Sequence, residues 1–366
     1  MDPERAPSPH LPPEFLARLS ALVPADRLAR VLASFAAPKN LVGWVNPLRP
    51  APELHTRLTD AGATLTRLEL TPTDTEPSGE ALLIEGLARE ALTHAGPLSD
   101  LLERGHLYLI NPASLLPPIA LAPQPGDQVL DLCAAPGGKS IQLAARLFAG
   151  SSADPARQAT GHLAAVEAVK PRFFKLKALL ERYGAPTDHR VRLFMKDGRD
   201  VGGAVPERFD RVLIDAPCSS EARFAADDET STEHWNPRKL AECSFKQRGL
   251  LRSGLESLKV GGTLVYSTCS FALEENEAVV ADVLQACEGA VEVAPIAFPD
   301  TVPAMPGVQY PDVVGATRVL PDSTWDGFFL VRLVKRAPLP GRAEPPPRPE
   351  RPGRHDRAEA KRRPRR

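Results

Sequence analysis

The chain has 366 residues, 43% hydrophobic and 25% charged, a composition typical of a globular protein with about two domains. Lysine and arginine number 45 against 46 aspartates and glutamates, and this balance argues against a dedicated polyanion-binding protein. The charge is uneven, however: residues 337–366 hold ten basic and four acidic side chains, whereas the residues before them hold 35 and 42.

Several classes of protein are excluded by simple patterns. No stretch of about 18 apolar residues is present, so no membrane span is expected. The first 15 residues lack the basic and apolar regions of a secretory signal. Five cysteines without a CxxC pair, together with scattered histidines, favour free thiols over disulfides or a metal site. We therefore expect a cytoplasmic protein with no metal and no membrane partner.

The N-terminal part predicts a small α+β unit. Residues 14–36 have apolar side chains at helical spacing, and residues 41–48 form an apolar segment that a proline interrupts. A short helix is expected over 52–61, and a strand over 65–70. These elements predict an accessory region over residues 1–100.

From about residue 125, strand and helix patterns alternate. The expected strands cover 128–132, 162–167, 191–195, 211–215, 263–267 and 328–333. The expected helices cover 138–148, 171–183, 239–258 and 274–287. Such alternation predicts an α/β fold, a mostly parallel sheet with helices on both faces, over residues 101–336. Residues 151–160 and 220–236 are expected to be surface insertions, and the proline- and arginine-rich residues 337–366 a disordered tail.

The first expected strand of this region ends at Asp131 and leads into a turn of small residues that opens a helix. The turn has the sequence CAAPGGK, which comprises Cys133, Ala134, Ala135, Pro136, Gly137, Gly138 and Lys139. Small residues allow a ligand to approach the backbone, and free N–H groups at a helix start suit polar ligand groups. A phosphate-binding P-loop is a competing interpretation of Gly138-Lys139-Ser140, although Cys133 stands where that motif needs its first glycine.

Acidic residues also follow the next two strands. Glu167 ends the second, where a carboxylate is well placed for the ribose hydroxyls of a nucleoside cofactor. Asp197 follows the third. Each is more simply a solvated acid when taken alone, but acids after three consecutive strands indicate a ligand site.

Cysteines accompany the next two strand ends. The fourth strand ends in DAPCS, with Asp215 and Cys218, and the fifth ends in YSTCS, with Cys269. Adjacent strand ends would bring these two thiols together. For a single cysteine, a small buried apolar role is the commoner one, and we assign that role to the thiols of Cys133, Cys243 and Cys287.

The motifs CAAPGGK, DAPCS and YSTCS, followed by DGFF at 326–329, resemble the Sun (Fmu-type, or NOP2/Sun) family of RNA cytosine-5 methyltransferases. The resemblance covers about residues 100–335 and includes the lead-in segment 108–127. It implies a class I (Rossmann-like) methyltransferase fold and S-adenosyl-L-methionine as cofactor. Residues 45–49 resemble a segment of the family's N-terminal RNA-binding accessory domain.

The resemblance also implies roles for individual residues. Cys269 would add to C6 of cytosine, Cys218 would assist proton removal and enzyme release, and Asp215 would bind the N3/N4 edge of the base. The turn 133–139, Glu167, Asp197 and Asp215 would hold the cofactor. The target cytosine would be unpaired or flipped out of a helix.

The RNA substrate is less sharply indicated than the reaction. Ribosomal RNA is favoured. Transfer RNA is the alternative, because residues 219–223 depart from the family's glycine-rich continuation and resemble more the branch that includes mitochondrial-ribosomal and tRNA-acting members. Two further alternatives are a P-loop nucleotide-binding protein and a non-catalytic RNA-binding factor in ribosome assembly. The basic tail is either a solvated extension or an attachment to RNA phosphates. Protein partners cannot be inferred from these patterns.

Overall fold

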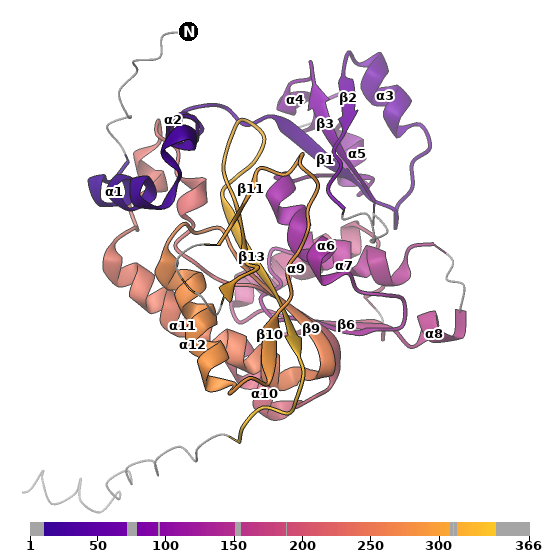
Figure 1. The fold of residues 1–366 in the computed structure, drawn as a ribbon. Coiled ribbons are helices and arrows are strands. Elements are labelled where there is room, and N and C mark those ends of the chain that lie inside the picture. Colours follow the sequence, from indigo (N-terminus) through magenta and orange to yellow (C-terminus); the bar gives the residue numbers. More distant parts are fainter. Residues whose placement is uncertain are drawn as a thin grey trace, which may run out of the picture.

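The computed structural model of the chain describes residues 11–71, 79–93, 96–150, 155–187, 189–307, 310 and 313–341. Two sheets form, one of nine strands and one of four (Figure 1). The ten basic residues of the tail fall within 342–366, outside the described residues, so its predicted disorder stays a prediction.

The large sheet has the strand order β11-β12-β13-β9-β8-β5-β6-β7, with β10 paired to β13. Its strands are β5 (Gln128–Asp131), β6 (His162–Val166), β7 (Val191–Phe194), β8 (Phe209–Asp215), β9 (Leu258–Thr268), β10 (Val291–Val293), β11 (Ala304–Pro306), β12 (Thr317–Val319) and β13 (Phe328–Lys335). The strands β5 to β9 run parallel, and β13 pairs antiparallel with β9. Apolar residues dominate the parallel strands because helices cover both sides of the sheet.

Two groups of helices cover the two faces (Figure 1). One core cluster contains residues of α6 (Leu116–Leu121), α7 (Gly138–Phe148) and α9 (Lys170–Arg182). The other contains residues of α10 (Val201–Ala204), α11 (Pro237–Ser257) and α12 (Glu277–Ala286). The predicted class I, Rossmann-like α/β fold is confirmed. The remaining short helices of this part are η1 (Pro112–Leu115), α8 (Pro155–Ala159), η2 (Gly198–Asp200), η3 (Glu221–Arg223), η4 (Glu229–Ser231) and η5 (Leu273–Glu275).

The smaller sheet is antiparallel and has the order β2-β3-β1-β4. It contains β1 (Leu41–Val45), β2 (Thr64–Arg67), β3 (Glu80–Glu85) and β4 (Leu107–Leu109), together with α3 (Leu54–Asp60), α4 (Arg89–Leu92) and α5 (Ser99–Glu103). The sequence analysis did not identify β3 or β4. The strand β4 follows residue 100, so this sheet extends past the predicted boundary of the accessory region.

The predicted helix over residues 14–36 is divided in two, α1 (Pro13–Leu22) and α2 (Ala25–Ala33). Pro24 explains the break: the backbone of the preceding Val23 is extended, as a following proline favours, and Pro24 has no N–H to continue the first helix.

The expectation that residues 220–236 form a surface insertion is wrong for residues 221–226, whereas residues 227–236 are exposed or half-buried, as expected. Glu221, Ala222, Phe224 and Ala226 are buried. The apolar members of this set share a cluster with Phe15 and other residues of the N-terminal helices. Aromatic packing explains the difference, since Phe15 lies edge-on to the ring of Phe224 with centroids 4.9 Å apart.

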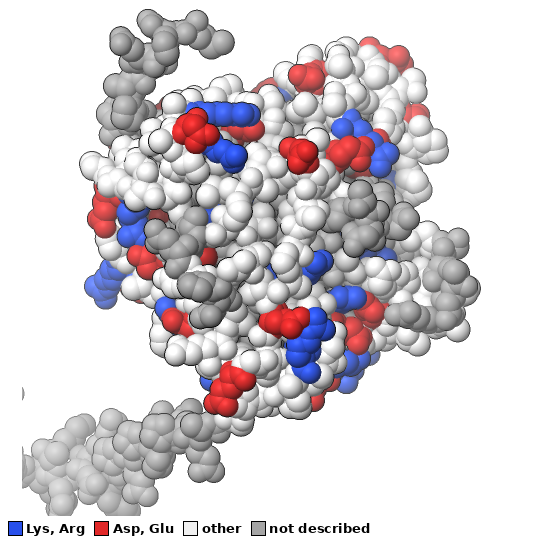
Figure 2. All heavy atoms as spheres, in the orientation of Figure 1, with Lys and Arg blue, Asp and Glu red and all other residues white. Residues whose placement is uncertain are grey.

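On the face that Figure 2 shows, acidic and basic side chains are interspersed, and neither charge forms a continuous patch. Within the described part of the chain, no helix combines the length and apolar character needed to cross a bilayer. The described residues also contain no group of three or more His, Cys, Asp or Glu side chains placed to hold a metal ion.

Candidate active site

The predicted site residues lie at or just beyond the carboxyl ends of the parallel strands. Asp131 ends β5, Glu167 follows β6 and Asp215 ends β8. Cys269 follows β9, whose Ser267 is paired with Asp215 across the sheet. This is the edge at which parallel α/β sheets bind their ligands.

The turn from Cys133 to Lys139 leads from β5 into α7. Gly137 has a φ of 120°, and a Cβ there would come within 2.8 Å of the Leu179 side chain. A glycine is therefore required for both the backbone conformation and the packing against α9. No side chain caps the start of α7, so its first N–H groups have no side-chain acceptor.

Asp131 lies beneath this turn and is 1% exposed. Its Oδ2 accepts a hydrogen bond of 2.6 Å from the hydroxyl of Ser140. Burial raises the pKa of Asp131 to about 7, and the Ser140 hydrogen bond partly opposes this rise. Ser140 is thereby engaged with the protein, which weakens the P-loop interpretation because that motif uses its serine on a metal ion.

Glu167 and Asp197 differ in how they are held. Glu167 is 5% exposed and accepts the backbone N–H of Val169 at 2.8 Å, with Arg172 at 3.7 Å. Asp197 is more open and is paired with Arg199, whose side-chain hydrogen bonds lower the pKa of Asp197. Glu167 is therefore the more rigidly placed of the two acids.

Asp215 receives contacts from both sides. Lys139 Nζ of α7 donates to its Oδ2 at 2.7 Å, and Ser267 Oγ donates to its Oδ1 at 3.1 Å. The Lys139 ammonium also lies over the ring of Phe328, 5.3 Å from its centroid. The carboxylate is thus fixed in orientation between the turn 133–139 and the end of β9.

The two predicted thiols are brought together. Cys218 Sγ and Cys269 Sγ are 3.4 Å apart, and both residues are half-buried. A hydrogen bond from Cys218 lowers the pKa of Cys269, and the positive charge of Arg223 adds to this effect. The same hydrogen bond, together with burial, raises the pKa of Cys218 well above its usual value. Cys269 is therefore the thiolate of the pair and Cys218 its proton-bearing partner.

The other cysteines have the opposite tendency. Burial raises the pKa of Cys133 and of Cys287, and it raises that of Cys243 to about 11. Cys269 is thus the one cysteine of the chain whose environment favours the thiolate. The apolar role expected for the other three thiols agrees with this difference.

Sequence reasoning did not identify Arg223 and Asp326, whose charges act near the thiols. The pKa of Arg223 is raised, chiefly by the charge of Cys269 and also by those of Asp215, Cys218 and Asp326. Arg223 lies in the segment that departs from the family pattern, and Asp326 begins the DGFF motif, to which no role was assigned. A basic residue five positions after Cys218 was the available signal.

The residues around the turn fit the cofactor that the family resemblance implies. The uncapped N–H groups of α7 suit polar ligand atoms, and the buried carboxylate of Glu167 suits hydroxyl groups. The carboxylates of Glu167 and Asp215 also provide negative charge that would attract a sulfonium cation.

Comparison with known proteins identifies the family of the chain. Residues 118–334 match the model of a family described as 16S rRNA methyltransferase RsmB/F. Ribosomal RNA small subunit methyltransferase F of Shigella dysenteriae is 36% identical over 249 residues, which cover 66% of this chain and 47% of that protein. The mouse mitochondrial tRNA (cytosine(34)-C(5))-methyltransferase is 38% identical over 189 residues, 51% of each chain. The chain spans about half the length of these curated relatives.

Solved structures agree with the fold. The crystal structure of PH0851 has a TM-score of 0.71 and 27% identity and covers 88% of this chain and 66% of its own. A methyltransferase homolog protein from Pyrococcus horikoshii has a TM-score of 0.65 and 28% identity, over 89% of this chain and all of its own. Together with the motif residues gathered at the ends of β5 to β9, the match over residues 118–334 shows that this chain belongs to the 16S rRNA methyltransferase RsmB/F family.

Proposed function

We propose that the chain transfers a methyl group from S-adenosyl-L-methionine to C5 of a cytosine in RNA, through a covalent bond between Cys269 and C6. The observation that carries this proposal is the thiol pair, with Cys218 Sγ 3.4 Å from Cys269 Sγ beside the fixed carboxylate of Asp215. The names of the relatives support RNA as the partner.

The chemistry begins at Cys269. Its thiolate forms a bond to C6, and the electron pair of the C5–C6 double bond moves to C5, which becomes nucleophilic. S-adenosyl-L-methionine supplies an electrophilic methyl group when it is bound. The turn 133–139, Glu167, Asp197 and Asp215 hold it in this proposal, and Asp215 also faces the N3/N4 edge of the base.

Release depends on Cys218. Once Cys269 is bonded to carbon, its sulfur no longer carries the charge that raised the Cys218 pKa. Cys218 can then give its proton to water and, as the thiolate, take the proton from C5. The electron pair of the C5–H bond restores the double bond, and the Cys269–C6 bond breaks with its electrons returning to sulfur. A cytosine within a duplex cannot take part, so the target is unpaired or flipped out.

Ribosomal RNA is the substrate that we favour, and transfer RNA is the alternative. The relative named for ribosomal RNA matches 66% of the chain, against 51% for the relative named for transfer RNA. The N-terminal region, which extends to the end of β4 at Leu109, would serve as an RNA-binding accessory region, and a cytoplasmic location belongs to the same proposal.

The test is methyl transfer from labelled S-adenosyl-L-methionine to small-subunit ribosomal RNA and, in parallel, to transfer RNA. We expect 5-methylcytosine in the ribosomal RNA with the wild-type protein and none with Cys269→Ala. Activity that survives this substitution would overturn the nucleophile assignment. Bisulfite mapping of RNA from cells with and without the protein would then locate the cytosine.

A further inference from the structure

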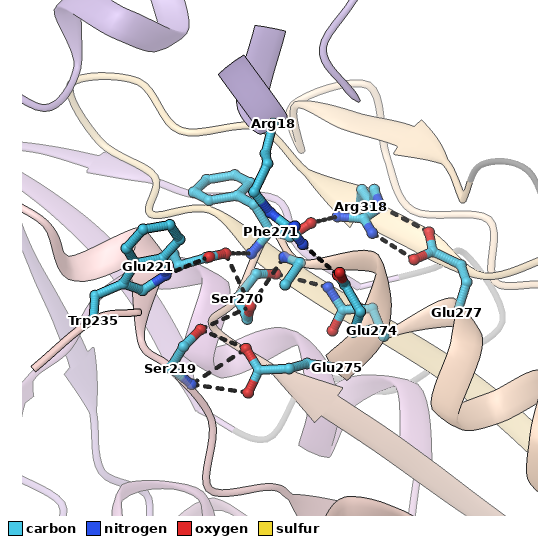
Figure 3. A network of polar contacts seen from close by, with 12 residues as sticks. Arg18, Ser219, Glu221, Trp235, Ser270, Phe271, Glu274, Glu275, Glu277 and Arg318 are labelled. Atoms are coloured by element: carbon cyan, nitrogen blue, oxygen red, sulfur yellow. Dashed lines mark hydrogen bonds and ion pairs between the residues drawn. The ribbon is translucent and has the colours of Figure 1, made fainter. Parts of the chain in front are cut away.

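The loops that carry the two thiols are joined by a buried polar network (Figure 3). Each thiol is followed by a serine, Ser219 after Cys218 and Ser270 after Cys269. The hydroxyl of Ser219 lies 3.1 Å from that of Ser270. The two serines therefore contact each other as the two cysteines do, one residue further along each loop.

A carboxylate from each loop binds the opposite loop. Glu275, downstream of Cys269, accepts the backbone N–H of Ser219 at 2.9 Å and also its hydroxyl. Glu221, downstream of Cys218, accepts the backbone N–H of Phe271 at 2.7 Å and the hydroxyl of Ser270 at 3.0 Å. The contacts are thus reciprocal, as Figure 3 shows.

Both carboxylates are removed from solvent. Glu221 is 1% exposed and Glu275 is 0% exposed. Trp235 Nε1 donates to Glu221 at 2.8 Å, and Gln247 Nε2 donates to Glu275 at 3.1 Å. A buried acid that satisfies several donors from a distant segment fixes the position of that segment, because its loss leaves those donors without a partner.

The backbone completes the connection. Ala222 N–H donates to the carbonyl of Cys269 at 3.0 Å, and Gln247 Nε2 also donates to the carbonyl of Pro217 at 2.9 Å. The residues on both sides of Cys218 are therefore held, and so are Cys269 and the two residues that follow it.

We infer that Glu221 and Glu275 are positioning residues that hold the Cys218 and Cys269 thiols in contact by clamping each loop to the other. This inference deepens the proposed function and rests on it for the catalytic consequence. Neither carboxylate touches the reacting atoms in this scheme, and each acts through the cysteine of the opposite loop.

The charge of Glu275 gives the clamp an electrostatic consequence. After the hydrogen bond to Cys269 and burial, it contributes to the raised pKa of Cys218, whereas the charges that act on Cys269 are those of Arg223 and Asp215. Glu275 thus helps to keep the proton on Cys218. The clamp sets the distance between the thiols, and Glu275 adds to the difference between their pKa values.

The experiment uses the full chain and measures the alkylation of each cysteine by iodoacetamide as a function of pH, with peptide mapping by mass spectrometry. In the wild-type protein, Cys269 should become reactive at a lower pH than Cys218. In Glu275→Gln, the Cys218 profile should move to lower pH and the Cys269 profile to higher pH. In Glu221→Gln, the Cys269 profile should move to higher pH because its hydrogen bond from Cys218 loosens.

The matched control is Glu274→Gln. Glu274 is the neighbour of Glu275 in the sequence, but its partner is Arg18 of α1, which lies outside the two loops that carry the thiols. We expect its alkylation profiles to match those of the wild-type protein. Profiles of folded Glu221→Gln and Glu275→Gln proteins that coincide with the wild-type profiles would overturn the inference.

Two milder variants keep the inference testable if a glutamine variant does not fold. Ser219→Ala and Ser270→Ala each remove one hydroxyl from the clamp and leave both carboxylates in place. Each should shift the Cys269 profile in the same direction by a smaller amount, and unchanged profiles in both would contradict the clamp.

Methyl transfer provides the second measurement. Misplacing a reacting group by about 1 Å can cost roughly 100-fold in rate, so kcat should fall 10- to 100-fold in the glutamine variants with little change in KM for RNA. If the wild-type protein methylates no RNA but the variants show the expected shifts in alkylation, the proposed function is refuted and the clamp is supported. If the wild-type protein methylates RNA but the variants have the alkylation profiles of the wild-type protein, the clamp is refuted and the proposed function is supported.

Discussion

The candidate active site, at the carboxyl ends of the parallel strands, has two halves that are held in place in different ways. In the acid half, at the ends of β5 to β7, each carboxylate has a local partner: Asp131 binds Ser140, Glu167 binds the N–H of Val169, and Asp197 binds Arg199. In the thiol half, at the ends of β8 and β9, the groups are held by residues about 50 positions away in sequence.

The two halves therefore depend to different degrees on the rest of the fold. Local partners place a carboxylate as soon as its strand and turn have formed, so the acid half depends little on the rest of the chain. Long-range contacts form only when β8 and β9 are paired and both loops have closed. The thiol half should therefore be more sensitive to distant substitutions, and the two halves should be separable by mutation.

The largest effect should come from the thiol half. Cys218→Ala removes the group that accepts the C5 proton, and loss of a positioned acid–base group costs about 10²- to 10⁴-fold in rate. We expect turnover to be lost while the bond from Cys269 to RNA still forms. A protein–RNA adduct that survives denaturing electrophoresis is the measurement, and its absence would contradict the release role.

Asp215 connects the two halves, so Asp215→Asn should affect both. Its charge is held by Lys139 from α7 and its position by Ser267 of β9. Removing one preorganised electrostatic contact costs about 3 kcal/mol, or roughly 100-fold in kcat. We also expect weaker binding of S-adenosyl-L-methionine, measured by calorimetry. A variant that loses cofactor affinity alone would assign Asp215 to the acid half.

Glu167→Gln should act on the acid half alone. The buried carboxylate loses its charge, and a hydrogen bond to a charged group contributes about 1.5–3 kcal/mol. We expect cofactor affinity to fall by roughly 10-fold or more, with the alkylation profiles of Cys218 and Cys269 unchanged. A shift in those profiles would show that the two halves are coupled.

The pH dependence of methyl transfer should report the thiol half. Because the pKa of Cys269 is lowered, the rate should rise with pH as this thiol ionises and should reach its plateau below the pH that an ordinary cysteine requires. Arg223→Leu removes a positive charge near Cys269 and should move the rise to higher pH. Arg30→Leu removes a basic residue that pairs with Asp322 and should leave the profile in place. An unmoved profile in Arg223→Leu would exclude this electrostatic role.

The smallest effect is expected from the tail. Deleting residues 342–366 removes ten basic side chains, and contacts with phosphates weaken as salt rises. RNA affinity should therefore fall several-fold at low salt and little at high salt, with kcat unchanged. Equal affinities of the two proteins at every salt concentration would show that the tail is a solvated extension.

The sequence predicted much of the fold and about half of the site. The strands from β5 to β9 and the helix α7 were expected within a few residues at most of their ends, except for the start of β9, because apolar runs and the small-residue turn are local signals. The strands β4, β10, β11 and β12 were missed because three residues carry no periodicity, and the six-residue strand β3 was missed as well. The proline at position 24 could have predicted the break between α1 and α2, whereas no local pattern predicted the burial of Glu221, Ala222, Phe224 and Ala226.

The sequence by itself determined the chemical groups: a thiol and an acid after β8, a second thiol after β9, and acids after β5 to β7. Each follows from a motif or from the end of an apolar run. Only the tertiary structure decided what holds the pair of thiols together and which groups shift their pKa values. The hydrogen bond from Cys218, the charge of Arg223 and the carboxylates Glu221 and Glu275 act across separate loops. Interactions between residues so far apart depend on how the strands are ordered in the sheet, and no local pattern in the chain encodes that order.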